Sequence, residues 1–126
     1  MAKPFPRTEP AWGLRAYLVL MGCAADRQTV TYEDLARRIN RGGPNLLARP
    51  LDLITRWCQR HSVPAIASLV VEQATGLPAP GFAAVTRDEI PHEQERVWGF
   101  DWFGILPPTI EELAESPPEL AIDERC

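Results

Sequence analysis

Apolar residues in the first half of the chain recur three or four positions apart, which is the spacing of one helix face. Residues 12–25 are apolar on nearly every side, so we expect a central helix that the rest of the fold covers. Residues 31–39 predict a shorter amphipathic helix with Thr31 as its N-cap. After the glycine- and proline-containing turn at 42–44, a longer helix is predicted over Asn45 to Arg60. These last two segments predict a helix-turn-helix.

The pattern changes after this unit to one that favours strands. Ile66 to Glu72 is rich in β-formers and predicts a strand, and Phe82 to Val85 predicts a returning strand beyond a loop rich in proline and glycine. A helix-turn-helix followed by such a hairpin is the layout of a winged helix. Asp88 to Val97 predicts a further helix, and the aromatic alternation over Val97 to Ile105 predicts another strand. Core filling is the favoured interpretation of these aromatic residues, and an exposed recognition patch is the alternative.

The C-terminal residues predict short helices. Thr109 with Glu112, and Ser116 with Glu119, have the spacing of capping boxes. The expected fold class is therefore α+β, with a winged-helix-like three-helix core, a β-hairpin wing and a C-terminal extension made of an aromatic strand and short helices. Residues 1–11 are predicted to form an extended arm, 12–106 a single domain and 107–126 an acidic extension.

Charge is divided unevenly along the chain. The net charge is −4, but residues 1–87 hold eleven basic and six acidic residues, whereas residues 88–126 hold two basic and eleven acidic ones. The helix-turn-helix between Thr29 and His61 carries six arginines and three acids. An acidic chain with one basic element can approach phosphate through that element.

The three cysteines lie far apart and match neither a disulfide framework nor a Cys-x-x-Cys metal site. A reducing cytoplasm is the expected location, and no apolar run is long enough to span a membrane. Leu20 to Cys23 has the letters of a lipoprotein cleavage site, but a buried first helix is the favoured interpretation.

Cys58 and His61 have the spacing of a thiolate–base pair or of two metal ligands, and a structural role is favoured for both. We expect no metal, no cofactor and no enzymatic activity.

Several segments resemble one known family, the C-terminal domain of the O6-alkylguanine-DNA alkyltransferases and the non-catalytic alkyltransferase-like proteins. Thr31 to Ala36 (TYEDLA) is similar to the family's helix opening, Thr-Tyr-Gly-Asp/Glu-Leu-Ala. Leu46 to Leu51 (LLARPL) is similar to the start of its recognition helix, and Pro64 to Gly76 is similar to its Pro-Cys-His-Arg-Val-Val strand and the turn that follows. The resemblance covers residues 12–82 and implies a DNA-binding helix-turn-helix.

The departures from this family concern the residues that react. Asn45 stands where the family has its arginine finger, and Ala65 or Ala67 stands where it has the nucleophilic cysteine. Alkyl transfer needs a thiolate with a neighbouring base, so we expect a non-catalytic protein. Glu33 replaces the glycine after the helix-opening tyrosine and places a negative charge where a phosphate would approach.

Two functions remain. In the first, the chain is a nucleic-acid-binding or regulatory module that binds DNA through the second helix of the helix-turn-helix. In the second, it is a protein-interaction module of the immunity, antitoxin or inhibitor type, whose acidic and aromatic C-terminal part binds a basic partner protein. The candidate nucleic-acid-binding residues are Tyr32, Arg41, Asn45, Arg49, Arg56 and Arg60.

Overall fold

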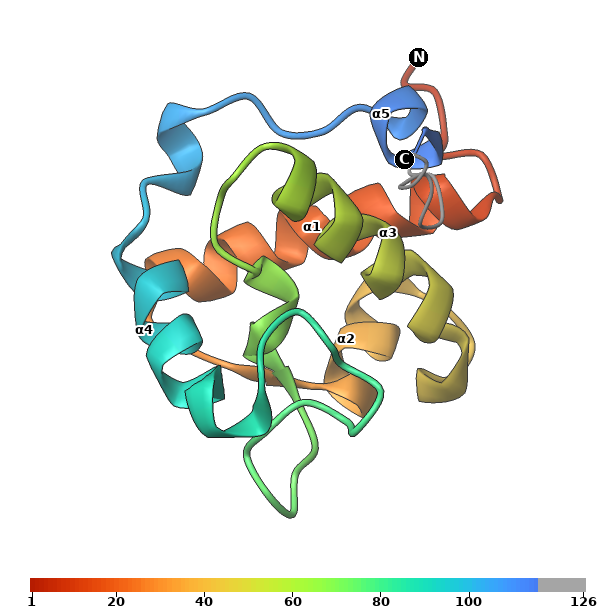
Figure 1. Ribbon diagram of the computed structural model, residues 1–126. Coiled ribbons are helices and arrows are strands. Elements are labelled where there is room, and N and C mark those ends of the chain that lie inside the picture. Colours follow the sequence, from red (N-terminus) through yellow and green to blue (C-terminus); the bar gives the residue numbers. More distant parts are fainter. Residues whose placement is uncertain (116–126) are drawn as a thin grey trace, which may run out of the picture.

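Helix α1 (Glu9–Ala25) is the central element of the computed structural model, which describes residues 1–115, and the other four α-helices of these residues all contact it (Figure 1). Tyr17 and Leu20 on this helix are fully buried, which confirms the prediction of a covered first helix. The helix begins at Glu9 and not at Trp12, because Thr8 caps it and Pro10 suits the first turn. Part of the predicted extended arm is therefore helical.

Helix α2 (Tyr32–Ile39) has the boundaries that its sequence predicts. The hydroxyl of Thr31 accepts a hydrogen bond from the backbone N–H of Asp34 at 3.1 Å, so the predicted N-cap is confirmed. Asn40 ends the helix in the left-handed conformation, with a φ of 65°. The buried side is formed by the three predicted apolar residues, Leu35, Ala36 and Ile39.

Helix α3 (Ala48–Arg60) begins later than predicted. Its expected first residues form a separate 3-10 turn, η1 (Pro44–Leu46), because the proline is preorganised for a new start. Leu47 between the two elements is fully buried. Helices α1 and α3 pack closely. A Cβ added to Gly13 of α1 would lie only 3.4 Å from the carbonyl oxygen of Pro50 of α3.

The predicted β-hairpin wing is wrong. Ile66–Leu69 forms a 3-10 helix, η2, and only Val70–Val71 is extended, as β2. This strand pairs in parallel with β1 (Val30–Thr31), with Val30 opposite Val70. The strand prediction failed because side chains of another helix bind the backbone of residues 65–68, as described below, so these residues take no part in a sheet.

Residues 82–85 form a loop and not a returning strand. The prolines at 78 and 80 have no N–H group to donate to a sheet, and the N–H of Ala79 donates to the hydroxyl of Tyr32 at 2.8 Å. The loop therefore lies beside α2 and α3, as the green and teal trace in Figure 1 shows. The α+β class is confirmed, with a two-stranded parallel sheet in place of the wing.

The aromatic segment is helical and not extended. A short 3-10 turn, η3 (Arg87–Glu89), leads into α4 (Ile90–Gly99), and a second turn, η4 (Trp102–Gly104), follows. The indole N–H of Trp102 donates to the carbonyl oxygen of Val97 at 2.8 Å and bends the chain. Trp102 is buried against Tyr17, so core filling is confirmed for this residue, whereas Phe103 is 69% exposed.

Helix α5 (Ile110–Ala114) begins with the predicted capping box of Thr109 and Glu112. Leu113 is fully buried and lies against Gly13 of α1, so the described part of the acidic extension packs on the helical body. The second predicted capping box, Ser116 with Glu119, lies outside the described residues. Within residues 1–115, no helix is both long enough and apolar enough to cross a membrane.

Candidate nucleic-acid interface

A cavity of about 610 Å³ lies between one side of α3 and the loop of residues 79–84. We call it the α3 cavity. Its helical wall consists of residues spaced three or four apart, so that one face of the helix points into it. The lining is mixed, with apolar, amide, hydroxyl and charged groups: Tyr32, Pro44, Asn45, Ala48, Leu51, Asp52, Thr55, Arg56, Gln59, Ala67, Ala79, Gly81, Phe82, Ala83 and Ala84.

Tyr32 connects α2 to the loop wall of the cavity. Its hydroxyl accepts the hydrogen bond from Ala79, and burial is the main cause that raises the pKa of this hydroxyl. On the outer side of the loop, the guanidinium of Arg87 donates to the carbonyl oxygen of Pro78 at 2.5 Å. These two contacts hold the N–H and C=O groups of one peptide bond, between Pro78 and Ala79, at the start of the loop wall.

The floor of the cavity includes Ala67 of η2, which α4 holds in place. A carboxylate oxygen of Glu93 accepts from the N–H of Ala65 at 2.7 Å, and the amide of Gln94 donates to the carbonyl oxygen of Ser68 at 2.9 Å. Both side chains are buried. An amide and a carboxylate that are buried and satisfied fix a backbone segment more firmly than solvent-exposed contacts do.

Asp52 binds two arginines on α3. Its carboxylate lies 2.8 Å from Nε of Arg56 and 3.6 Å from a terminal nitrogen of Arg49. Arg56 lines the cavity with a side chain that is 31% exposed, whereas Arg49 is 59% exposed beside it. Two guanidinium groups bind one carboxylate here, and the sequence of α3 holds three arginines and one aspartate.

Three of the six predicted site residues, Tyr32, Asn45 and Arg56, meet at the cavity, and Arg49 adjoins them through Asp52. Asn45 lies in η1 at the cavity and not in α3. The remaining two lie elsewhere. Arg41 forms an ion pair with Glu9 at 3.2 Å, and its side chain is only 18% exposed. Arg60 donates to the carbonyl oxygen of Glu112 at 2.8 Å.

The two described thiols are free and buried. Cys58 is 1% exposed, and burial raises the pKa of its thiol to about 12, so it is protonated at neutral pH. His61 lies on the surface and its ring stacks on Trp57, with the centroids 4.5 Å apart. Burial likewise raises the pKa of the Cys23 thiol. Neither cysteine lines the α3 cavity, where Ala67 stands.

Reasoning from sequence missed Asp52, Thr55 and Gln59 as lining residues. Their spacing on α3, at 52, 55–56 and 59, was the signal that could have found them. The loop wall at 79–84 carried no such signal.

Within residues 1–115, no group of three His, Cys, Asp or Glu side chains is arranged to hold a metal ion. No protein-family model, curated protein or solved structure matches this chain.

Proposed function

We propose that this protein is a non-catalytic nucleic-acid-binding module that places α3 against a duplex and receives an unstacked base in the α3 cavity. The observation that carries the proposal is the cavity itself, bordered by a helix with a net positive charge. Its volume lies within the range of about 300–1,000 Å³ that is typical of small-molecule sites. A base inside a duplex reaches such a site only after it turns out of the stack.

The lining offers groups for both the flat face and the polar edge of a base. The rings of Tyr32 and Phe82 offer apolar surface for stacking, which tolerates any base. Asn45, Thr55 and Gln59 offer donors and acceptors for the polar edge of a base. Aromatic side chains with a few convergent polar groups are typical of small-molecule pockets, and an unstacked base is a ligand of this kind.

The arginines on the same helix suit the phosphates. Arg49 is more exposed than Arg56, the other arginine that binds Asp52. A terminal nitrogen of Arg49 lies 3.6 Å from the carboxylate, which is a loose ion pair. A phosphate can compete for such a guanidinium, because phosphate accepts two parallel hydrogen bonds from it. The resemblance of residues 12–82 to alkyltransferase-like proteins supports the same mode of binding. The alanines at 65 and 67 and the buried thiol of Cys58 support the non-catalytic part of the proposal.

The test is an anisotropy titration of a fluorescent duplex at about 50 mM salt, with wild type and with Ala83→Trp. Ala83 is an exposed residue of the cavity wall, so the indole fills the cavity without entering the core. We expect salt-sensitive binding by wild type and at least about tenfold weaker binding by the variant. Ala25→Trp adds the same indole at the exposed end of α1 and serves as the control. No measurable binding by wild type, or equal effects of both substitutions, would make the proposal wrong.

A second candidate function is a protein-interaction module, and one observation favours it. Phe103 and Leu106 are 69% and 87% exposed, and they lie close together in the chain between α4 and α5. Exposed apolar side chains mark a surface that binds a partner where they form one contiguous patch, and this candidate places Phe103 and Leu106 in such a patch. In this candidate the acidic C-terminal region selects a basic protein. A pull-down with wild type and with the double variant Phe103→Ser, Leu106→Ser tests it, and a partner retained equally by both argues against it.

A further inference from the structure

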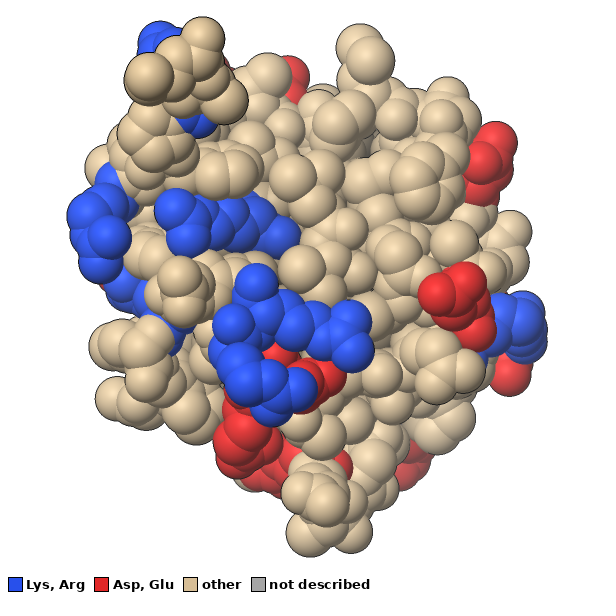
Figure 2. Space-filling model, turned by 180° about the vertical axis from the view of Figure 1, so that it is seen from behind, with Lys and Arg blue, Asp and Glu red and all other residues tan. Residues whose placement is uncertain are grey.

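A second basic surface lies apart from the α3 cavity, around the middle of α1 and the end of α2. Figure 2 shows basic side chains gathered on the face of the molecule opposite to that of Figure 1. A shallow groove of about 350 Å³ lies on this second surface, and none of its lining residues borders the α3 cavity. It is lined by Phe5 of the arm, by Arg15, Leu18 and Val19 of α1, and by residues 38–40. We call it the arm groove.

Arg15, which lines this groove, is held in place by aromatic rings and a backbone carbonyl group. The guanidinium of Arg15 lies 4.2 Å from the centroid of the Trp12 ring and 4.9 Å from that of Phe5. It also donates to the carbonyl oxygen of Ile39 at 2.9 Å. Within residues 1–115, no carboxylate lies at ion-pair distance from Arg15. Its charge is therefore not neutralised by an ion pair within these residues, and its guanidinium is held by two aromatic rings and one carbonyl oxygen.

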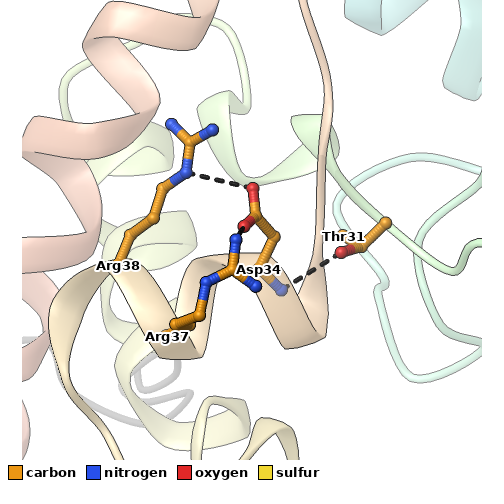
Figure 3. A network of polar contacts seen from close by, with 4 residues as sticks. All are labelled: Thr31, Asp34, Arg37 and Arg38. Carbon is orange, nitrogen blue, oxygen red and sulfur yellow. Dashed lines mark hydrogen bonds and ion pairs between the residues drawn. The ribbon is translucent and has the colours of Figure 1, made fainter.

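Arg38, the second arginine of the groove, binds Asp34 through Nε and not through its terminal nitrogens. Figure 3 shows that Asp34 bonds to both Arg37 and Arg38, while its own backbone N–H donates to Thr31. Arg38 contacts the carboxylate through Nε at 3.0 Å, and its two terminal nitrogens point away from Asp34. The side chain of Arg38 is 54% exposed. These terminal nitrogens have the fork geometry that binds a carboxylate in two parallel hydrogen bonds.

The floor between the two arginines is apolar. Leu18 is 47% exposed although it lies in a helix that is otherwise mostly covered, and Val19 and Phe5 are partly exposed beside it. A phosphate backbone would bind the arginines and leave this floor in water. A peptide that carries both carboxylates and an aliphatic or aromatic side chain would satisfy the arginines and cover the floor at the same time.

We propose that the arm groove docks an acidic segment of a partner protein, with one apolar side chain of that segment against Leu18 and its carboxylates on Arg15 and Arg38. This site is independent of the proposed nucleic-acid interface, because the two surfaces share no lining residue.

The probe is a displayed library of random twelve-residue peptides, selected on the immobilised full chain. We expect enrichment of sequences that combine Asp or Glu with Leu, Ile, Phe or Trp. The binding of an enriched peptide is then measured with Leu18→Asp and Arg38→Glu, whose side chains are both exposed. Each substitution should weaken it at least about tenfold. These two variants avoid Arg15, whose replacement would disturb the packing on Trp12.

The matched control is Arg27→Glu, which makes the same charge change on an exposed side chain beyond the other end of α1. It should leave peptide binding within about twofold of wild type. Replacing the apolar residue of the peptide by Ser should weaken binding as much as Leu18→Asp does. The proposal is overturned if no acidic peptide is enriched, or if Leu18→Asp and Arg38→Glu leave peptide binding unchanged. It is also overturned if these two variants weaken duplex binding as strongly as they weaken peptide binding, because the groove would then be a phosphate site.

Discussion

Helices α2 and α3 share a pattern of apolar and charged positions and differ in what their exposed sides can bind. Each has a buried apolar side and a single aspartate that bonds to two arginines. On α2, Asp34 lies in the first turn, where the helix dipole favours its charge and Thr31 caps its N–H. On α3, Asp52 lies one turn into the helix and lines a cavity. An aspartate that binds two arginines therefore lies at a helix end on α2 and at a candidate site on α3.

The buried sides of the two helices should contribute equally to folding. Leu35→Ala on α2 and Ile54→Ala on α3 each remove a fully buried side chain. Each should lower the free energy of unfolding by about 2–5 kcal/mol, as large-to-small core substitutions do. Urea unfolding followed by circular dichroism measures both. A loss well below this range on only one helix would show that its packing differs from that described here.

The exposed sides should differ in duplex binding. Arg49→Glu combined with Arg56→Glu should weaken duplex binding by about ten- to a hundredfold, because hydrogen bonds between charged groups contribute about 1.5–3 kcal/mol. Arg37→Glu combined with Arg38→Glu makes the same charge change on α2 and should weaken it less than about threefold. Anisotropy titrations at low salt compare the two double variants. Equal losses would mean that duplex binding follows total charge and not the α3 surface.

The two aspartates should have opposite effects when neutralised. Asp52→Asn removes a negative charge beside Arg49 and Arg56 and should raise duplex affinity about two- to fivefold, since exposed ion pairs hold their partners by about 1 kcal/mol or less. Asp34→Asn should leave duplex affinity unchanged and lower the thermal midpoint slightly, because it removes a favourable charge from a helix N-terminus. The same titration and a thermal melt check both. An Asp52→Asn variant that binds duplex more weakly would assign the carboxylate itself to the site.

Local sequence signals were sufficient for α2 and for the start of α5, and insufficient for the sheet and for the segments that form η2 and η4. Local signals defined α2 and α5, whose caps Thr31 and Thr109 are confirmed. The wing prediction failed because the backbone around η2 binds Glu93 and Gln94, which follow it by more than twenty residues. The cavity was predictable only on its helical side. Its other wall depends on the contact between Tyr32 and Ala79, 47 positions apart, which no local pattern reveals.

The most direct measurement is the fluorescence of 2-aminopurine placed within a duplex, with and without the protein at saturating concentration. This base fluoresces weakly when stacked and strongly when it leaves the stack. The account predicts a severalfold rise with wild type and none with Ala83→Trp, even at concentrations where the variant is bound. Saturated wild type that leaves the fluorescence at its stacked level would contradict the proposal that the α3 cavity receives a base.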